Sequence, residues 1–371
     1  MIRCTRCVIP DTRPDTAFID GACSACISYD KRKLIDWHAR EKELLRILET
    51  TPRNGSGYDC IVPSSGGKDS TWQTLKLIRI GARPLVVTAT TCQLTSLGRK
   101  NIDNLARFAT TVEVTPQREV RARLNRLGLS LVGDISWPEH VSIFTTPFRM
   151  ACDLGIPLIF YGENPQEAYG GPQGADEAKE MTRRWVSEFG GFLGLRPADM
   201  IGQEGITERD MLDYMPPSSE RVEKLGLRAY FLGQFYEWDS ARNARVSAEN
   251  GFKTLHTRLP GPANYWEAEN LDNAQTGIHD HLMYRKYGYG RTAAQVSVNV
   301  RAGLMSREQA MLHVKSRDGV FPYVYVGVDL SVVLKRIGMT LAELDEIMER
   351  FTNHDLFVRV EDRRPILKEF A

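Results

Sequence analysis

The stretch that decides the fold reads Cys60-Ile61-Val62-Pro63-Ser64-Ser65-Gly66-Gly67-Lys68-Asp69-Ser70, and a helix-like stretch from Thr71 to Ile80 follows it. An apolar strand that ends in two glycines lets backbone N–H groups approach an anion closely, because glycine has no Cβ, and the positive end of the next helix adds to the attraction. Lys68 supplies a charge, and Ser65 and Ser70 supply hydroxyl donors. The segment therefore predicts a cradle for the pyrophosphate part of a nucleotide.

The spacing of this loop narrows the class of enzyme. A Walker loop has Ser or Thr after its lysine and a longer gap after its first glycine, so the kinase and GTPase motif is excluded here. Residues 65–70 instead match the Ser-Gly-Gly-x-Asp-Ser signature of the PP-loop ATP pyrophosphatases. This resemblance implies cleavage of ATP to AMP and pyrophosphate, with adenylation of a carbonyl or amide oxygen. It assigns ATP binding to Ser64, Ser65, Gly66, Gly67, Lys68, Asp69 and Ser70, catalysis to the last three of these, and Mg²⁺ to Asp69.

Strand-like and helix-like stretches alternate from Tyr58 onward. Apolar runs that fit strands lie at 60–63, 84–88, 111–114 and 156–161, and helical or loop segments separate them. Repeated βα units predict an α/β fold with a doubly wound parallel sheet of the PP-loop type. Ligands bind beyond the carboxyl ends of such strands, so Thr88, at the end of its strand, is placed to meet the adenine or ribose of ATP.

Four of the seven cysteines form a metal-binding pattern. The spacing C-x2-C-x15-C-x2-C, typical of a zinc ribbon with four sulfur ligands, is made by Cys4, Cys7, Cys23 and Cys26. Asp20-Gly21 between the two pairs predicts a hairpin turn. Because four thiolates fill the coordination sphere, we expect the zinc to be structural. Of the other three, Cys60 and Cys152 read as core residues, and Cys92 near a strand end leaves a thiol role open.

The chain divides into four regions. These are a zinc ribbon at 1–30, a helix and linker at 31–57, a PP-loop ATP-binding domain at 58–240 with an insertion around 170–217, and a mostly helical C-terminal region at 241–371. Two capping boxes, Ser306 with Gln309 and Thr340 with Glu343, predict the first turns of two C-terminal helices.

Charge and hydropathy argue against a membrane and a nucleic acid as partners, although a local charged patch is still compatible with the sequence. Lys and Arg number 48 against 47 Asp and Glu, and the resulting formal charge of +1 gives no field that attracts nucleic acid or an anionic membrane. No apolar stretch approaches the roughly 20 residues that span a bilayer, and the first residues lack the apolar core of a signal peptide. We therefore expect a cytoplasmic protein.

Three further motifs resemble a particular PP-loop family. They are Thr95-x-x-Gly98-x-x-Asn101, Tyr161-Gly162-Glu163-Asn164, and the segment from His279 to Arg291. Together with the cysteine pattern they resemble the N-acetyl sugar amidotransferases of bacterial surface-glycan synthesis, over nearly the whole chain. The resemblance implies an AMP-forming C–N ligase, which converts the acetamido group of a nucleotide-activated sugar to an acetamidino group.

The same resemblance implies that further residues contact the substrate or a metal. These are Thr95, Gly162, Glu163, Asn164, Glu167, His281, Lys286 and Arg291. Carboxylates suit a metal, and guanidinium and ammonium groups suit an anionic nucleotide-sugar. For Glu163 and its neighbours a solvated loop is the alternative, and for His281 the alternative is a hydrogen-bonded structural role.

The source of nitrogen lies outside this sequence. A glutaminase of the triad type needs a cysteine between glycines, and Thr91-Cys92-Gln93 lacks them. The other glutaminase type needs an N-terminal cysteine, whereas Cys4 belongs to the zinc pattern. The resemblance implies a separate glutaminase and a cyclase-like subunit that channels ammonia.

Two other functions fit parts of the sequence. Several PP-loop enzymes with zinc modules thiolate tRNA, but they typically use additional cysteines for sulfur transfer, and the balanced charge offers tRNA little attraction. A nucleotide-binding scaffold without catalysis is the second alternative. Binding of tRNA would distinguish the first, and exchange of pyrophosphate into ATP would exclude the second.

Overall fold

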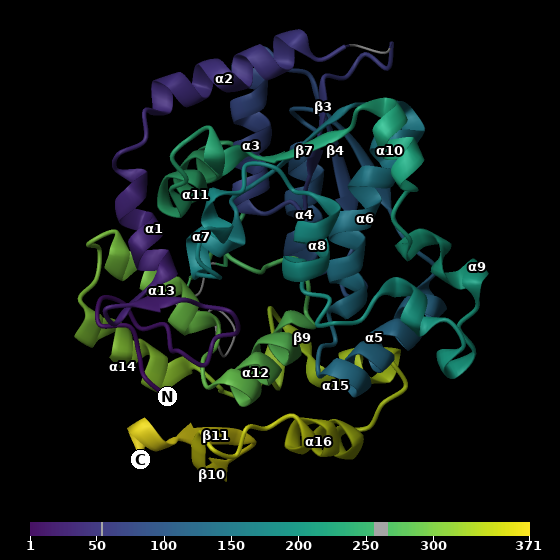
Figure 1. Ribbon diagram of the computed structural model, residues 1–371. Coiled ribbons are helices and arrows are strands. Elements are labelled where there is room, and N and C mark those ends of the chain that lie inside the picture. Colours follow the sequence, from purple (N-terminus) through teal and green to yellow (C-terminus); the bar gives the residue numbers. More distant parts are fainter. Residues whose placement is uncertain (53–54, 256–265) are drawn as a thin grey trace.

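The computed structural model describes residues 1–52, 55–255 and 266–371 (Figure 1). Its centre is a sheet of five parallel strands: β3 (Cys60–Pro63), β4 (Pro84–Ala89), β5 (Thr110–Val114), β6 (Leu158–Tyr161) and β7 (Arg228–Phe231). They lie in the order β5-β4-β3-β6-β7, with Ile61 level with Leu85 and Ile159. The predicted α/β fold with a parallel sheet is confirmed.

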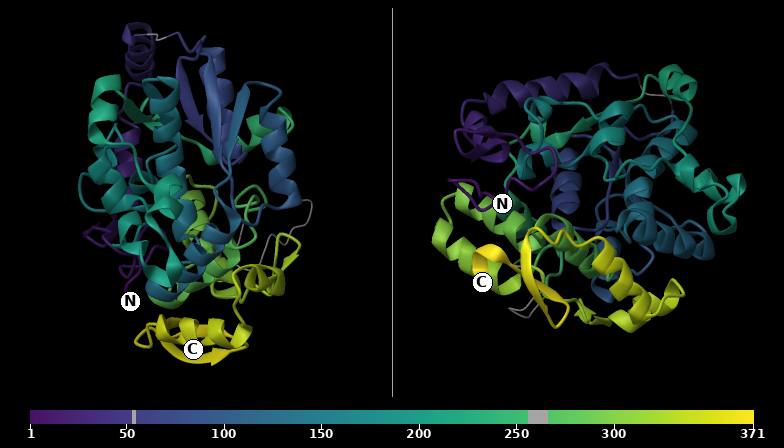
Figure 2. Two further views of the ribbon diagram at one scale, coloured as in Figure 1. Left: turned by 90° about the vertical axis from the view of Figure 1, so that its right-hand side faces the viewer. Right: turned by 60° about the horizontal axis from the view of Figure 1, so that its bottom comes forward.

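Helices bury both faces of this sheet (Figure 2). Val62 and Phe160 lie in an apolar cluster with residues of α2 (Trp37–Thr50) and α3 (Lys68–Arg79). Ile61 and Ile159 lie in a second cluster, with residues of α6 (Trp137–Leu154) and α8 (Arg183–Phe189). Successive side chains of a strand point to opposite faces, so a sheet covered on both sides requires the continuous apolar runs seen in the sequence. Each fully buried aliphatic side chain contributes about 1.5–3 kcal/mol.

The order of the strands positions the candidate site. The chain passes from β3 through β4 to β5 on one side, whereas β6 and β7 lie on the other side of β3. The loops that leave the carboxyl ends of β3 and β6 therefore run in opposite directions and open a crevice between them. Residues 64–70, called the glycine loop below, follow β3, and Gly162 and Glu163 follow β6.

Helices form the connections between strands. α4 (Ser96–Leu105) joins β4 to β5, and α5 (Arg118–Val132) and α6 join β5 to β6. The connection from β6 to β7 contains the short helices α7 (Pro165–Tyr169), α8, α9 (Glu208–Met211) and α10 (Ser219–Leu225). After β7, α11 (Ser240–Glu249) packs on α3. The structure thus places α11 with the sheet, although the sequence assigned it to the C-terminal region.

The first residues form a compact hairpin and helix. β1 (Phe18–Ile19) pairs with β2 (Ala22–Cys23), and α1 (Ser24–Arg32) follows directly. Asp20 and Gly21 have φ values of +49° and +77°. Two successive positive φ values are the signature of the tight turn that Asp-Gly favours, so the predicted hairpin is confirmed.

The C-terminal region lies against the carboxyl-end side of the sheet (Figure 1). Its helices are α12 (Thr276–Tyr287), α13 (Arg291–Arg301), α14 (Arg307–Arg317), α15 (Leu330–Arg336) and α16 (Leu341–Arg350). Both predicted capping boxes are confirmed by their reciprocal hydrogen bonds. Two hairpins, β8–β9 (Val324–Tyr325, Val328–Asp329) and β10–β11 (Phe357–Glu361, Arg364–Leu367), differ from the mostly helical expectation.

Candidate active site

The glycine loop is held in one shape by its own hydroxyl groups. The Gly66 N–H donates to Ser64 Oγ at 3.0 Å, and Ser64 Oγ donates to Ser70 Oγ at 2.8 Å. Gly66 has a φ of +80°, and a Cβ at this position would lie 2.7 Å from the backbone nitrogen of Ile102. Glycine is therefore required both by the backbone conformation and by the close approach of α4. Gly67 caps α3, so the positive end of that helix begins at the loop.

Lys68 lies almost buried at the start of α3, with 4% of its surface exposed. Its ammonium group forms ion pairs with Asp69 and, at 3.2 Å, with Glu269. Burial alone would lower the pKa of Lys68, but the two carboxylates outweigh burial and raise that pKa above its ordinary value. The loop therefore holds a permanent positive charge beside the helix N-terminus.

Two residues of α11 brace the loop from behind. Asn243 Nδ2 donates to Asp69 Oδ1 at 3.0 Å, and Ser247 Oγ donates to the Lys68 carbonyl at 2.6 Å. Both side chains are fully buried. These contacts fix the orientation of the two charged residues before a ligand arrives, which is the condition for electrostatic preorganisation.

A cavity of about 460 Å³ opens over the glycine loop, beyond the carboxyl ends of β3, β4 and β6. We call it the first cavity. It lies at the reversal of strand order, where open α/β sheets bind ligands, and its volume is in the range of small-molecule sites. Its lining includes all seven residues of the glycine loop together with Val87, Ala89, Thr90, Thr91, Gly98, Asn101, Glu139, Gly162, Glu163, Tyr169, Glu269, Asp272 and Arg291.

Five of these residues bring carboxylates to the cavity: Asp69, Glu139, Glu163, Glu269 and Asp272. Burial, together with the nearby charge of Asp69, raises the pKa of Glu163 to about 7. Burial also raises the pKa of Asp272 to about 6. Carboxylate oxygens beside a phosphate cradle are the donors that Mg²⁺ takes in nucleotide sites, so this set fits the ion expected with ATP.

Of the predicted motif from His279 to Arg291, only Arg291 lines the first cavity. It begins α13 and forms an ion pair of 2.8 Å with the buried carboxylate of Asp280. Asp280 lies in α12, where it is 1% exposed. This pairing holds the guanidinium in place while it faces the cavity, so Arg291 can hold an anionic group of a ligand.

Other residues predicted at the site cap helices, bond to backbone groups or lie outside the cavity lining. Thr95 caps α4 and also donates to the Leu271 carbonyl, and Asn164 caps α7 and donates to the Ala175 carbonyl at 2.9 Å. Thr88 is buried outside the lining, because the neighbouring Val87 and Ala89 carry the cavity-facing positions of β4. The side chain of Glu167, in α7, lies outside the described part of the chain.

Two basic residues expected at the substrate lie elsewhere. His281 is 1% exposed, its Nε2 accepts from Arg285 Nε at 2.9 Å, and its ring packs on Phe321. Burial lowers the pKa of His281 to about 3, so the ring is neutral and structural. Lys286 donates to the Val132 carbonyl and lies over the ring of Phe351, away from the first cavity. Helix α12 is buried on several sides. Its many polar residues did not predict this burial.

Only weak sequence patterns pointed to the residues that reach the site from distant parts of the chain. Glu269 and Asp272 lie in the non-helical segment 266–275, which crosses to the sheet and pairs with 93–95. Thr95 N–H donates to the Asp272 carbonyl at 2.9 Å. Acidic residues at 267, 269 and 272 were the available signal, yet only the tertiary approach of this segment to the end of β4 brings Glu269 and Asp272 to the first cavity and pairs Glu269 with Lys68.

A second cavity of about 600 Å³ adjoins the first, and Thr90 and Thr91 line both. Its lining includes the guanidinium groups of Arg99, Arg118, Arg121 and Arg336, against the carboxylates of Glu113 and Glu119. Arg121 is 2% exposed, and its Nη2 has no hydrogen-bond partner among the described residues. A buried guanidinium with an unused donor favours an anionic ligand in this cavity.

The four ribbon cysteines converge in the arrangement that a metal requires. All are fully buried, and their sulfur atoms lie within 4.8 Å of one another. The separations are 3.8 Å between Cys4 and Cys26 and 3.6 Å between Cys7 and Cys23. Sulfurs about 2.3 Å from a tetrahedral zinc ion lie about 3.8 Å apart, so the cluster fits Zn²⁺.

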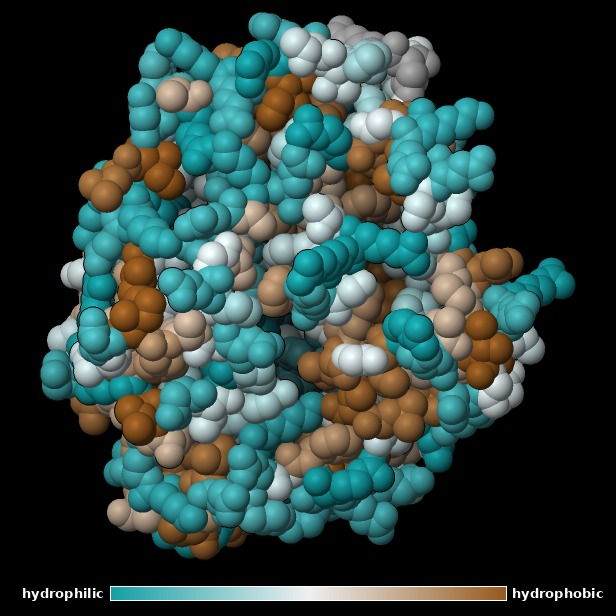
Figure 3. Space-filling view, viewed as in Figure 1, coloured by the Kyte–Doolittle hydropathy of each residue, from teal (hydrophilic) through white to brown (hydrophobic). Residues whose placement is uncertain are grey.

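The surface of the molecule is predominantly polar on the face in Figure 3, where apolar residues form separate groups. Within the described residues, we find no helix with the length and apolar character needed to cross a membrane.

Comparison with known proteins gives a match to one domain. Residues 252–368 match the family model of the LPS biosynthesis protein WbpG-like C-terminal domain. The solved structure of NMN synthetase from Francisella tularensis matches 60% of this chain and 99% of its own, at 13% sequence identity and a TM-score of 0.27. No curated protein sequence matches. The C-terminal part of this chain is therefore similar to the WbpG-like C-terminal domain.

Proposed function

We propose that this chain is an AMP-forming amidotransferase, which adenylates the N-acetyl oxygen of a nucleotide-activated sugar and replaces that oxygen with ammonia. The observation that carries the proposal is the glycine loop, with Lys68 and five carboxylates around the first cavity, at the reversal of strand order. The domain match to LPS biosynthesis proteins supports a sugar as the substrate. A cytoplasmic location follows from the need for ATP.

The reaction needs two displacements. The acetamido oxygen attacks the α-phosphorus of ATP, and the bond from that phosphorus to the bridging oxygen breaks and releases pyrophosphate. Ammonia then adds to the activated carbon and loses a proton, and the oxygen leaves as part of AMP. Lys68, Ser65, Ser70 and the end of α3 are placed to stabilise the negative charge on the pyrophosphate. Asp69 and Glu269 would hold Mg²⁺, which would supply positive charge against the phosphates.

Glu163 suits the proton transfer in the second displacement. Its carboxyl lines the first cavity at the end of β6, and burial beside Asp69 raises its pKa to about 7. A base with a pKa near the working pH is present in its ionised form and still accepts a proton readily. We assign Glu163 the proton that ammonia loses as it adds.

The charge of the second cavity suits an anionic nucleotide-activated sugar as the substrate. A nucleotide-activated sugar carries a diphosphate, and the guanidinium groups of Arg121 and Arg336 line a space of suitable charge. The shared residues Thr90 and Thr91 connect this space to the first cavity. We place the nucleotide part of the sugar in the second cavity and its N-acetyl group at the boundary.

The test is incubation of the purified chain with ATP, Mg²⁺, ammonium and a panel of nucleotide-activated N-acetyl sugars. We expect AMP and pyrophosphate in equal amounts, and a product whose mass falls by the difference between O and NH. Glutamine should not replace ammonium unless a separate glutaminase and a channel subunit are added. ADP and orthophosphate as products, or glutamate released by the chain alone at the rate of product formation, would contradict the proposal.

Thiolation of tRNA, the alternative, gains no support from the cysteines outside the ribbon. Burial raises the pKa of Cys92 well above its ordinary value, and the thiol donates to Gln275 at 2.7 Å. Burial also raises the pKa of Cys60 and of Cys152. A sulfur carrier needs an accessible thiolate, and none of these three provides one.

A further inference from the structure

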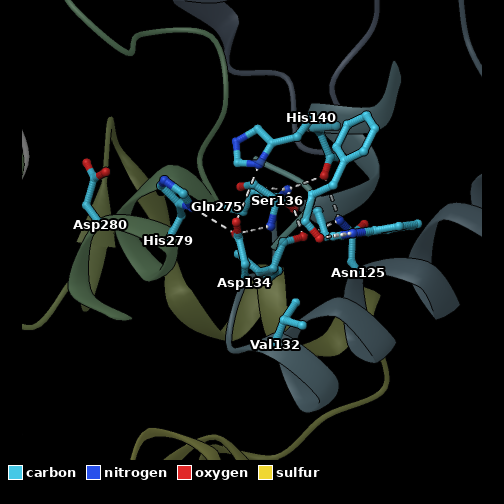
Figure 4. A network of polar contacts seen from close by, with 12 residues as sticks. Asn125, Val132, Asp134, Ser136, His140, Gln275, His279 and Asp280 are labelled. Atoms are coloured by element: carbon cyan, nitrogen blue, oxygen red, sulfur yellow. Dashed lines mark hydrogen bonds and ion pairs between the residues drawn. The ribbon is translucent and has the colours of Figure 1, made fainter. Parts of the chain in front are cut away.

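A second group of metal-ligating side chains lies apart from both cavities and from the ribbon (Figure 4). Asp134 lies in the turn between α5 and α6, His140 lies in α6, and His279 lies in α12. One ligand atom from each lies within 4.8 Å of the other two. The group therefore joins an element of the sheet domain to an element of the WbpG-like domain.

The donor types and separations suit a transition metal. Two imidazoles and one carboxylate form a known set for divalent Zn, Fe, Mn and Co. His140 Nδ1 lies 3.4 Å from Asp134 Oδ2, and two ligands each about 2.0–2.1 Å from a tetrahedral ion lie about 3.4 Å apart. His279 Nδ1 lies 2.8 Å from Asp134 Oδ1, a hydrogen-bond distance that must lengthen slightly on binding.

One nitrogen atom of the group lacks a hydrogen bond in the described part of the chain. His140 Nδ1 is buried and has no hydrogen-bond partner among the described residues, although the ring points at Asp134. A buried polar atom without a hydrogen bond is destabilising, and a bond to a metal ion would satisfy it.

The surroundings fix the carboxylate as metal sites require. The Ser136 N–H donates to Asp134 Oδ1 at 2.8 Å, so a backbone group orients the ligand. The side chains of His140 and His279 keep 26% and 21% of their surface exposed, which leaves a path for an ion and for a water ligand. The group thus has three protein ligands and one open side.

We propose that Asp134, His140 and His279 bind a divalent transition-metal ion of the Zn²⁺ type, which fastens α6 to α12. Glu139, next to His140, lines the first cavity and accepts from Gln275 Nε2 at 2.8 Å. The ion therefore stabilises the wall that the two domains build together. This site is independent of the proposed reaction.

The experiment compares metal content between the full-length wild type and single-histidine variants. Each protein is equilibrated with Zn²⁺, passed through gel filtration and measured by elemental analysis. We expect His140→Ala and His279→Ala to hold one equivalent less than wild type. His354→Ala, which removes an exposed histidine of the C-terminal region, should hold the wild-type amount.

A second measurement separates metal binding from the loss of a hydrogen bond. Added Zn²⁺ should raise the Tm of wild type, and it should leave the Tm of His279→Ala unchanged. Equal zinc content in wild type and both variants would overturn the proposal, as would a Tm response to zinc that His279→Ala retains. In either case the three residues form only a hydrogen-bonded group.

Discussion

The ammonium group of Lys68 forms ion pairs with Asp69 and Glu269 in a space that is almost closed to water. In the proposed reaction, ATP would compete with both carboxylates, because a triphosphate brings more negative charge to the same ammonium group. The two carboxylates would then be released to bind Mg²⁺.

Replacing this lysine should affect activity far more than replacing an exposed one. Lys68→Ala leaves Asp69, Glu163 and Glu269 without their shared cation and removes a contact to the departing pyrophosphate. We expect turnover to fall about 100-fold or more, the loss typical for one preorganised donor. The measurement is pyrophosphate release with saturating ATP, and Lys42→Ala, at an exposed position of α2, is the control. Equal activity in the two variants would remove Lys68 from the catalytic step.

The raised pKa of Glu163 predicts a specific pH dependence. The carboxyl becomes ionised only as the pH rises through about 7, so a step that needs the carboxylate accelerates over that interval. At a constant concentration of free ammonia, we expect the wild-type rate to rise between pH 6 and 8. Glu163→Gln should be slower and should lack this rise. A variant that keeps the wild-type profile would show that another group accepts the proton.

At the scale of elements, the glycine loop packs closely against the backbone of α4. A Cβ at Gly66 would meet the backbone of Ile102, whereas a Cβ at Gly81, after α3, would meet nothing within 4 Å. Both glycines have a positive φ, of +80° and +90° respectively. An alanine at either position would therefore adopt an unfavourable backbone conformation. Only at position 66 would its Cβ also collide with a neighbouring backbone.

This pair provides a matched test of the loop. Gly81→Ala should lower the free energy of unfolding by about 1–2 kcal/mol, the cost of a left-handed residue with a Cβ. Gly66→Ala should cost more, because the backbone of α4 must move, and it should also weaken ATP binding at least about tenfold. Urea unfolding and calorimetric titration with ATP measure the two effects. The outcome against the prediction is equal ATP affinity in both variants.

Local patterns predicted those elements whose formation depends on nearby residues. The strands follow from continuous apolar runs, the hairpin from Asp20-Gly21, and two helix starts from their capping boxes. The position of α11 could not be predicted this way, since its Asn243 and Ser247 are polar residues buried against the loop. The sequence could not decide between a substrate contact and a structural role for His281. The packing of its ring on Phe321 determines its environment, and this contact is tertiary.

At the scale of the whole molecule, the ribbon connects distant parts of the chain. Arg307 Nε donates to the carbonyls of Cys4 and Cys7 at 3.2 and 3.0 Å, and Arg3 pairs with Glu369 at 2.5 Å. Ser24 Oγ donates to the Gly171 carbonyl at 2.9 Å, beside α7 and its cavity residue Tyr169. The ribbon thus supports both the C-terminal helices and one wall of the first cavity.

Loss of metal from the ribbon should therefore weaken the entire protein. We expect Cys26→Ser to contain about one equivalent of zinc less than wild type and to have a lower Tm, because a structural zinc ion contributes directly to folding. Cys152→Ser, at a partly exposed position outside the ribbon, is the control and should keep its zinc. Full zinc content in Cys26→Ser would contradict the assignment of the four cysteines.

The docking of the ribbon on α13 and α14 also has a consequence for synthesis. Val8 of the ribbon is buried in a cluster with Val296, Ala310 and Val314, which the ribosome adds about 300 residues later. Chains emerge N-terminus first, so the apolar side of the ribbon is uncovered while most of the protein is still being made. Early capture of zinc would keep this segment folded during that interval, and the apolar side of the ribbon would be covered only after α13 and α14 have been synthesised.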